Sequence, residues 1–411
     1  MARDKKEETK SPADLQAVHP LSGRTQPYGL PRKEGIQIID AQVWEVIRQF
    51  IKSRQWEGEL VVPEDKVDPL LATKPSYGGF MLGFDFHLTS QGPKLIEINT
   101  NAGGLATVFT FERNPLLSSF LKKKFVAALL KEYRLATGVE SAVPSCVAII
   151  DDCVSQQPLY PEMLLYKQML EEVGICCHVV SPEDLHLSES SDALLFQGTP
   201  VDFVYNRLTD FRLKNPEHAH LREALLSQVV VMSPHPATYA RCADKRQLLR
   251  LSQVTPLVPT TYQLKDKPIE DWVKIKKDYV FKPPDGAASR GVYRGNKISN
   301  TKLHQLPPDT IVQQFAAPFV GQDGAKQDFR VYTRDTSILG IATRHFTGQV
   351  LEMKSPKSGF AAVLPDGFCC QPVVVSSRFL KFCATMKQQC KEVPTKAATE
   401  CHSSDDCYHA P

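Results

Sequence analysis

The chain has 411 residues, of which 42% are hydrophobic and 23% are charged, and its formal net charge is +3. These values are ordinary for a globular protein, and the length allows roughly two or three packed domains. A net charge this small, without an arginine-rich arm, argues against nucleic acid as a partner. No apolar run is long enough to cross a bilayer, which argues against a membrane as a partner.

The N-terminus and the cysteines bear on the compartment. Residues Met1–Lys10 are charged rather than apolar, which argues against a secretory signal. Without an export signal, the 11 cysteines are expected to stay reduced, and the expected location is the cytoplasm. Several of the cysteines lie after Phe368, near His402 and His409. Their spacing lacks the close cysteine pairs of a structural zinc site, so residues 369–411 are predicted to be a disordered tail.

The first part of the chain begins with a polar segment, residues 1–30, which is predicted to be disordered. Residues 31–144 form the first predicted unit. Within it, apolar residues recur at helical spacing over Ala41–Ile51, which predicts an amphipathic helix. Two apolar runs, Gly83–Leu88 and Lys94–Asn99, predict strands joined into a hairpin by a turn that contains glycine and proline.

Residues 145–232 form the second predicted unit. A buried strand is predicted at Val147–Asp151, a helix at Tyr160–Glu172 that ends before Gly174, and a second strand at Cys176–Val180. Strand, helix and strand in this order favour a Rossmann-like βαβ unit with a parallel sheet. We expect this unit to be the substrate domain.

Residues 233–368 form the third predicted unit. A helix is predicted at Arg246–Ser252. Strands are predicted to end at Lys282 and to span Ile311–Phe315, Gln327–Tyr332 and Ile338–Arg344. This mixture of helices and strands along the chain indicates the α/β (α+β) class.

Three side chains that carry oxygen gather on the predicted hairpin. If its two strands pair, Asp85 lies near the strand with Glu97 and Asn99, which share one face because strand side chains alternate. Ile96 and Ile98 are then expected to point into the core. Such a face suits Mg²⁺, which keeps several waters and binds substrate phosphates. Taken alone, these residues are equally compatible with the polar outer face of an edge hairpin.

Two lysines and a glycine-containing turn suit phosphate. Lys245 begins a helix and Lys282 ends a strand, positions where a lysine is more often simply solvated. Lys282, however, leads into Pro283–Val292, whose small residues let backbone N–H groups approach phosphate oxygens. Arg290 in this turn adds a guanidinium fork that fits phosphate. Further on, the basic segment Lys354–Ala362 is either a surface loop or a lid that closes over ATP.

Two further segments extend this pattern. The strand Ile311–Phe315, with Gln313 and Gln314, either borders an adenine through its backbone or is simply a buried strand. Arg330 and Arg344 lie on two predicted antiparallel strands. They are either structural ion-pair partners or part of a cluster that holds a triphosphate.

In this order, the motifs resemble those of the ATP-grasp superfamily, circularly permuted in the manner of eukaryotic-type glutathione synthetases. In most ATP-grasp ligases the metal motif comes last, whereas here Asp85 and Glu97–Thr100 precede both lysines. Phe203–Arg207 is similar to the strand ahead of their nucleotide domain, and Pro236–Ala240 to their helix entry before the first ATP lysine. The resemblance covers about Gly79–Leu364. It implies an ATP-grasp fold with a βαβ substrate domain.

The resemblance also implies a role for each motif, with ATP and Mg²⁺ as cofactors. The metal ligands would be Asp85, Glu97 and Asn99. The residues that bind ATP would be Lys245, Lys282, Arg290, Gln313, Gln314 and, from the lid, Lys354. The catalytic residues that stabilise the transferring phosphoryl group would be Arg330 and Arg344. Arg207 would contact a substrate carboxylate, because a bidentate fork suits that role.

Two departures argue against glutathione synthesis itself. The acid nearest to the second lysine is Asp285, where the glutathione enzymes carry a glutamate, and their serine-rich stretch is Ala102–Ala106 here. We therefore expect an ATP-dependent carboxylate–amine ligase that forms an amide through an acyl phosphate, with an amino acid or small peptide as substrate. The alternatives are an ATP-grasp phosphotransferase and a non-catalytic nucleotide-binding regulatory protein. A homodimer is the expected assembly, as the commonest among soluble proteins.

Overall fold

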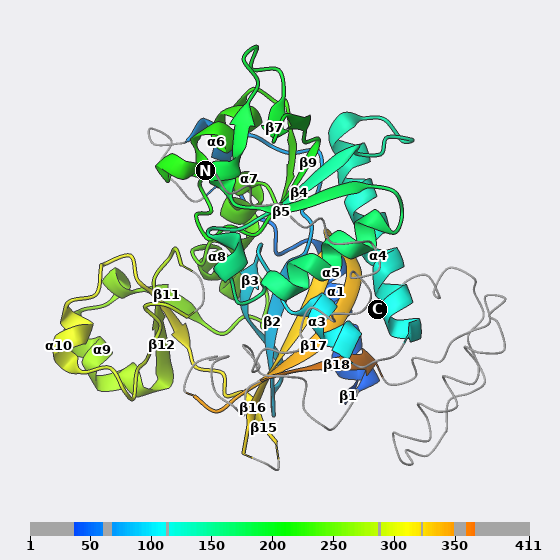
Figure 1. Ribbon diagram of the computed structural model, residues 1–411. Helices are drawn as coiled ribbons and strands as arrows, with labels where there is room; N and C mark the ends of the chain where they lie inside the picture. The colour runs from blue at the N-terminus through cyan, green and yellow to red at the C-terminus, as the bar shows by residue number, and fades with distance from the viewer. Residues whose placement is uncertain are drawn as a thin grey trace, which may run out of the picture.

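The computed structural model describes residues 37–60, 68–111, 115–286, 289–321, 324–348 and 359–365. These residues form four sheets with helices between them (Figure 1). The disorder predicted for residues 1–30 and 369–411 lies outside the described ranges, as does Lys354.

The largest sheet has seven strands and joins the first and last described parts of the chain. Its order is β1-β18-β17-β16-β2-β3, and β15 pairs with the beginning of β16. The strands span Gln37–Ile39 (β1), Leu82–Thr89 (β2), Gly92–Asn99 (β3), Phe319–Val320 (β15), Lys326–Arg334 (β16), Ser337–Phe346 (β17) and Gly359–Pro365 (β18). Only β1 and β18 run parallel to each other. The hairpin β2–β3 and the antiparallel pair β16–β17 confirm the strands predicted there.

The prediction of a loop at Lys354–Ala362 is wrong in its second part. Gly359–Pro365 forms β18, which pairs with β17 on one side and with β1 on the other. Ala361 and Ala362 are buried, at 2% and 1% exposure. These alanines therefore belong to a buried strand of the sheet.

Helix α1 (Ala41–Ser53) covers one face of this sheet and confirms the predicted amphipathic helix. It begins after Asp40, whose carboxylate accepts two backbone hydrogen bonds from the first turn, and it ends at Arg54 in a left-handed conformation. Its apolar face packs on β2, where the rings of Phe50 and Phe86 lie 6.4 Å apart. Burial of each such ring contributes about 1.5–3 kcal/mol.

On the opposite face, α3 (Leu105–Phe111) and α4 (Pro115–Thr137) lie between the large sheet and a second sheet. The second sheet has the order β10-β9-β4-β5, with every pair parallel. Its strands span Cys146–Ile150 (β4), Cys176–Val180 (β5), Phe203–Asn206 (β9) and Val231–Ser233 (β10), and α5 (Tyr160–Glu171) connects β4 to β5. This arrangement confirms the predicted βαβ unit with a parallel sheet.

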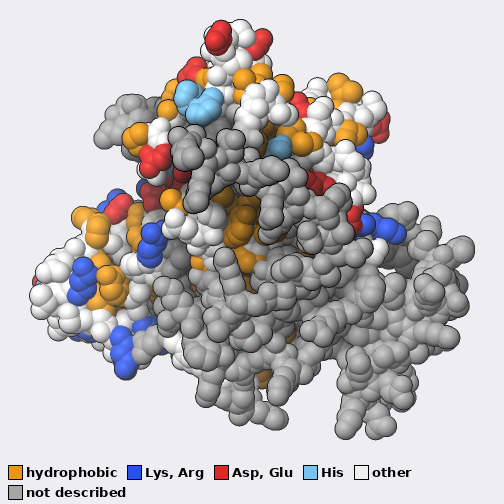
Figure 2. All heavy atoms as spheres, viewed as in Figure 1, with side chains coloured by type: hydrophobic (Ala, Val, Ile, Leu, Met, Phe, Trp, Pro, Cys, Tyr) orange, Lys and Arg blue, Asp and Glu red, His pale blue; other side chains and the backbone are white. Residues whose placement is uncertain are grey.

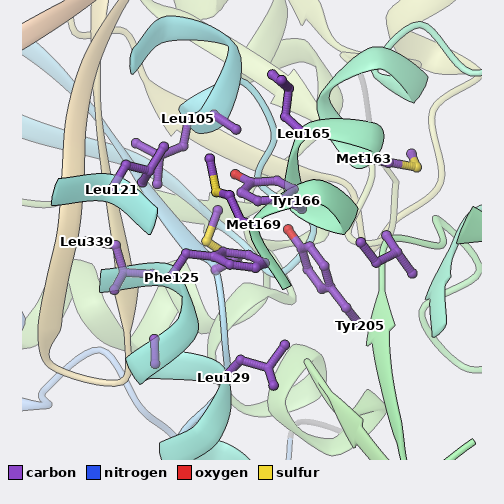
Figure 3. Packing of buried hydrophobic residues seen from close by; sticks show 14 of the residues in the cluster. Leu105, Leu121, Phe125, Leu129, Met163, Leu165, Tyr166, Met169, Tyr205 and Leu339 are labelled. Carbon is purple, nitrogen blue, oxygen red and sulfur yellow. The ribbon is translucent and has the colours of Figure 1, made fainter. Parts of the chain in front are cut away.

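A shared apolar core ties these helices to both sheets (Figure 3). Phe125 of α4 stacks on Tyr166 of α5 with ring centroids 4.3 Å apart, and Tyr205 of β9 meets both rings edge-on. Leu339 of β17 belongs to the same cluster. Aromatic pairs contribute about 0.5–1.5 kcal/mol beyond their buried area, so this core fixes the two sheets relative to each other.

A third sheet forms a lobe at the side of the large one (left in Figure 1). Its order is β11-β14-β12-β13, with strands at Thr261–Gln263 (β11), Tyr279–Lys282 (β12), Tyr293–Arg294 (β13) and Ile311–Gln314 (β14). Helices α9 (Ile269–Ile275) and α10 (Asn300–His304) pack on it around the buried Trp272. Lys and Arg side chains are spread over the outer surface of this lobe (Figure 2). Strands β12 and β14 confirm the two strands predicted here.

Short elements connect the sheets. They are α2 (Pro69–Ala72), α6 (Ala219–Leu226), α7 (Pro236–Thr238), a π-helical turn (Tyr239–Ala243), α8 (Gln247–Val254), and 3₁₀ helices at Val154–Gln156, Pro182–Asp184, Pro216–His218, Leu264–Asp266 and Lys276–Asp278. A fourth, antiparallel sheet consists of β6 (Leu185–Leu187), β7 (Leu194–Phe196) and β8 (Thr199–Pro200). Helix α8 corresponds to the helix predicted at Arg246–Ser252. Within the described ranges, none of the helices combines the length and apolar character that a bilayer span requires.

Candidate functional site

A cavity of about 250 Å³ lies between the large sheet and the side lobe. Strands β2, β3, β16 and β17 contribute residues to it from one side, and β12 and β14 contribute from the other. The predicted site residues that line it are Asp85, Glu97, Asn99, Lys245, Lys282, Arg290, Gln313, Gln314 and Arg344. Segments that are up to 259 residues apart in the chain, such as those of Asp85 and Arg344, thus meet at one place.

Two acids and two arginines form a buried cluster in the wall of this cavity. Nε and Nη2 of Arg330 donate to the two carboxylate oxygens of Asp85, each at 2.6 Å. Nη2 of Arg344 donates to Oδ2 of Asp85 at 2.6 Å, and Arg344 also donates two hydrogen bonds to Asp328. All four side chains are at most 7% exposed. Because the charges alternate in sign, the cluster is neutral as a whole.

The carboxylate of Asp85 accepts hydrogen bonds from both arginines, and its predicted role as a metal ligand stays a prediction. Asn99 Nδ2 also donates to Asp85, at 3.0 Å, so four hydrogen bonds converge on this carboxylate. Three of these bonds end on Oδ2 and one ends on Oδ1. A buried acid needs a cation beside it, and Arg330 and Arg344 provide this positive charge for Asp85.

The same contacts separate the pKa values of the two acids. Burial raises the pKa of Asp85, but Arg330 and Arg344 outweigh burial and hold that pKa below its ordinary value. For Asp328 burial outweighs the ion pair with Arg344, and the pKa is raised. Sequence reasoning missed Asp328, although it stands two residues before Arg330 on one strand and therefore shares its face.

Glu97 and Asn99 face the cavity from β3, on the same side of the strand. Asn99 directs Nδ2 toward Asp85 and Glu97, at 3.0 and 3.5 Å, and this leaves its carbonyl oxygen for another partner. Glu97 is only partly buried. A carboxylate and an amide oxygen at the edge of a cavity fit Mg²⁺, which needs only one or two carboxylates when phosphates and waters complete its shell.

A β-bulge sets the direction of the residue before Glu97. Asp85 pairs with Glu97, and the next residue, Phe86, pairs with Leu95, so Ile96 is the extra residue. The prediction that Ile96 points into the core is therefore wrong, because the bulge turns it into the lining of the cavity. Sequence alternation assumes an unbroken ladder and cannot locate such a bulge.

Lys282 is buried at the end of β12, at 4% exposure. Its Nζ donates to Oε1 of Gln313 at 2.8 Å and to the Ile96 carbonyl at 3.1 Å. Burial, with Lys245 nearby, lowers the pKa of Lys282 to about 8 although Glu97 opposes the shift. A buried ammonium with so few partners is stabilised by an anionic ligand.

Gln313 lies in the same wall of the cavity and has an unpaired hydrogen-bond donor among the described residues. Its side chain is 2% exposed, and in the described part of the chain its Nε2 has no hydrogen-bond partner. A buried donor without an acceptor is rare and costs about 1–3 kcal/mol. A bound molecule that places an acceptor in the cavity beside Lys282 would remove this cost.

Lys245 contacts the turn that follows β12. Its Nζ donates to the Gly286 carbonyl at 2.8 Å, and its backbone N–H donates to the Pro284 carbonyl at 3.2 Å. Arg290, on the same turn, is exposed and lines the cavity. Asp285 is directed to other partners, since the Tyr239 hydroxyl donates to it at 3.1 Å.

Part of the cavity has an apolar lining. Val280, Val292, Phe315 and Phe346 line it, and the guanidinium carbon of Arg294 lies 3.1 Å from the centre of the Phe315 ring. Stacked planar groups of this kind suit a nucleobase. Sequence reasoning missed Arg294, because its contact with Phe315 depends on the pairing of β13, β12 and β14.

His87 also lines the cavity, two residues after Asp85 on β2. Its Nδ1 lies 2.7 Å from the Ala316 carbonyl, and burial lowers its pKa. The neutral ring donates to that carbonyl and fixes the segment that leads to Pro318.

Arg207 lies outside this cavity, at the end of β9, and is 3% exposed. Its Nη2 is 3.6 Å from the buried Glu162, and its Nη1 donates to the Tyr205 hydroxyl at 3.0 Å. Glu162 in turn accepts backbone hydrogen bonds from Gly104 and Ala106, at 2.8 and 3.0 Å. These contacts favour a structural role for Arg207, in which it holds α5 against the loop after β3.

Neither a family model nor a curated protein matches the chain. Among solved structures, it is similar to a protein from Methylobacillus flagellatus KT named as a gamma-glutamylcysteine synthetase, at 12% identity and a TM-score of 0.50, over 86% of this chain and 95% of that one. It also matches a glutathione synthetase-like effector from Globodera pallida at 12% identity and a TM-score of 0.44, over 79% of this chain and 86% of that one. A third match is the D-cycloserine synthetase DcsG, at 18% identity and a TM-score of 0.33, over 61% of this chain and 83% of that one.

At these identities the likeness concerns the fold. The match with a TM-score of 0.50 covers 86% of this chain. The chain has an α/β fold like that of the matched protein, and its sequence motifs predict that this is the ATP-grasp fold.

Proposed function

We propose that this protein is an ATP-dependent carboxylate–amine ligase that forms an amide through an acyl phosphate. The observation that carries the proposal is the cavity in which Lys245 and Lys282 face Glu97 and Asn99 beside a neutral acid–arginine cluster. Phosphoryl transfer needs little covalent chemistry from a protein, so positioned charges of this kind are what it requires.

ATP would bind with its base against the apolar residues of the cavity, beside Arg294 and Phe315. Its phosphates would then extend toward Lys282 and Lys245, with Arg290 from the turn. The buried ammonium of Lys282 would gain an anionic partner. The polar contacts of Gln313 and Gln314 would border the base or the first phosphate, and the orphaned Nε2 of Gln313 would find its acceptor there.

Glu97 and Asn99 would hold Mg²⁺, with phosphate oxygens and waters as the remaining ligands. When bound, this ion neutralises charge on the phosphates and polarises them as a Lewis acid. Asp85 would act through its neighbours: it orients Asn99 at 3.0 Å and fixes both guanidinium groups. We therefore assign Asp85 a positioning role in the proposed site.

Arg344, which lines the cavity, would stabilise the phosphoryl group in transit, and Arg330 would support it through Asp85. In the first step a carboxylate oxygen of the acid attacks the γ-phosphorus and ADP leaves. In the second, an amine attacks the acyl carbon, loses a proton to solvent, and phosphate leaves. The acid would be an amino acid or a small peptide, and the residue of the lid expected to contribute is Lys354.

The test is ADP release with Mg²⁺ and pooled amino acids, amines and short peptides. The variant is Glu97→Gln, which removes the proposed metal ligand while leaving the buried Asp85 cluster intact. The matched control is Glu140→Gln, the same change at an exposed position outside the cavity. The proposal requires release that depends on both an acid and an amine, survives in Glu140→Gln and is lost in Glu97→Gln.

Other outcomes separate the alternatives. Stable phosphate on a single acceptor, with no amine requirement, would identify a phosphotransferase. Tight ATP binding without ADP release under any mixture would favour a non-catalytic regulatory protein. Either result would replace the ligase proposal.

A further inference from the structure

A second group of side chains suited to bind a metal lies away from the cavity, at the beginning of two parallel strands. Cys146 begins β4, Cys176 begins β5, and the two residues are direct neighbours in the register of the sheet. His178 follows Cys176 by two residues and therefore projects from the same face of β5. Strand β5 is the edge of this sheet.

The three ligand atoms are close together. The two Sγ atoms are 3.5 Å apart, and Cys176 Sγ is 3.4 Å from His178 Nε2. Each of the three lies within 4.8 Å of the others. A tetrahedral Zn²⁺ with bonds of about 2.3 Å to sulfur and about 2.1 Å to nitrogen places two sulfurs about 3.8 Å apart, and sulfur and nitrogen about 3.6 Å apart. The first two separations differ from these values by a few tenths of an ångström, and Cys146 Sγ lies within 4.8 Å of a ring nitrogen of His178, so the group is compact enough to hold one ion.

Hydrogen bonds hold the backbone that carries these side chains. The carboxylate of Asp202 accepts from the backbone N–H groups of Ser145 and Cys146, at 2.6 and 3.0 Å. Lys167 Nζ donates at 2.7 Å to the carbonyl of Cys177, the residue between the other two ligands. Support of this kind orients metal ligands before the ion arrives.

The ring of His178 has a fixed neighbour as well. It lies against Phe196 of β7, with ring centroids 4.7 Å apart. Cys146 is buried, Cys176 is exposed and His178 is partly exposed. An ion held by the three would therefore be reached from solvent, which leaves room for a water as the fourth ligand.

We propose that Cys146, Cys176 and His178 form a Zn²⁺ site with one position open to water. Two thiolates and an imidazole suit Zn²⁺, whereas Mg²⁺ requires oxygen ligands, so this site is distinct from the one proposed at Glu97 and Asn99. Binding forms two Zn–S bonds and one Zn–N bond and releases the two thiol protons to solvent. Because the ion binds only the paired strands, it ties the edge strand β5 to β4 and stabilises the folded sheet.

The experiment uses the full chain, kept reduced with a phosphine so that neither a disulfide nor a thiol reductant competes. Zn²⁺ is titrated in competition with a chromophoric chelator. Co²⁺ is titrated separately, since thiolate-to-cobalt charge-transfer absorption reports sulfur ligands. The variants are Cys176→Ser and His178→Ala, and the control is Cys153→Ser, another exposed cysteine outside the group. The cysteines after Phe368 are present in all four proteins, so any metal that they bind is the same in each and does not affect the comparison.

We expect Cys176→Ser to lose one equivalent of Zn²⁺ relative to both wild type and Cys153→Ser, together with part of the cobalt–thiolate absorption. His178→Ala should bind that equivalent at least about tenfold more weakly. Zn²⁺ should raise the thermal midpoint of wild type but not that of Cys176→Ser. Equal Zn²⁺ and Co²⁺ binding by all four proteins would overturn the proposal. So would reduced wild type that binds no Zn²⁺, with a Cys146–Cys176 disulfide mapped after oxidation.

Discussion

Replacing Asp85 with asparagine tests how the buried acid–arginine cluster is held together. The substitution keeps the size of the side chain but removes the charge that Arg330 and Arg344 share at 2.6 Å. Arg344 retains Asp328, whereas Arg330 has no other salt bridge among the described residues. Removing one partner of a buried pair costs about 3–5 kcal/mol, because the remaining charge is left uncompensated. We expect the free energy of unfolding to fall by about that amount in Asp85→Asn.

Urea denaturation followed by far-ultraviolet circular dichroism measures this change. Glu97→Gln is the control, because Glu97 is only partly buried and the hydrogen bond that its side chain accepts from Asn99 is long at 3.5 Å. Its free energy of unfolding should stay within about 0.5 kcal/mol of wild type. The double variant Asp85→Asn/Arg330→Met should recover part of the loss, since the stranded guanidinium is gone. If Asp85→Asn unfolds at the wild-type urea concentration, the cluster does not carry the stability assigned to it.

Three further predictions follow from individual contacts. Lys282→Met should weaken ATP binding. Wild-type affinity for ATP should also fall as pH rises above 8, because burial lowers the pKa of Lys282 to about 8 and only the charged form attracts phosphate. Equal affinities in calorimetric titrations below and above pH 8 would contradict this. Burial lowers the pKa of His218, but its two flanking carboxylates outweigh burial and raise it above 6.5 overall. The stability that protonated His218 contributes should therefore be complete below pH 6.5 and should be lost as pH rises through its raised pKa. The difference in denaturation midpoint between wild type and His218→Asn should shrink over that pH range. A difference that does not change with pH would refute this. Gly103→Ala should lower the free energy of unfolding by about 1–3 kcal/mol. The added Cβ would lie 2.2 Å from Leu159 Cδ1 and 2.7 Å from Arg207 Nη2, which is too close for either contact. An unchanged thermal melt would show that the loop after β3 adjusts freely.

Local patterns predicted several elements well. Two apolar runs joined by a turn with glycine and proline predicted the hairpin β2–β3, and helical spacing predicted α1. The contacts that the sequence does not predict join residues that lie far apart in the chain. Arg330 pairs with Asp85 across 245 residues of sequence, and nothing near either residue signals which cation the acid will find.

The same reason explains the errors at Ile96 and β18. Whether Ile96 faces the core depends on a bulge in its pairing with β2, and strand β18 exists because β17 and β1 flank it. Its glycine and alanines give a weak strand signal by themselves. The order of the motifs along the chain, by contrast, could be read directly, and it was sufficient to predict the fold.

The central claim is that a carboxylate becomes an acyl phosphate in the cavity at Lys282 and Glu97. Hydroxylamine intercepts acyl phosphates and yields a hydroxamate, so it can replace the unknown amine. With ATP, Mg²⁺ and the pooled acids, wild type and Glu140→Gln should form a hydroxamate in step with ADP, and Glu97→Gln should form neither. ADP release without hydroxamate, or hydroxamate formation that Glu97→Gln leaves unchanged, would contradict the account.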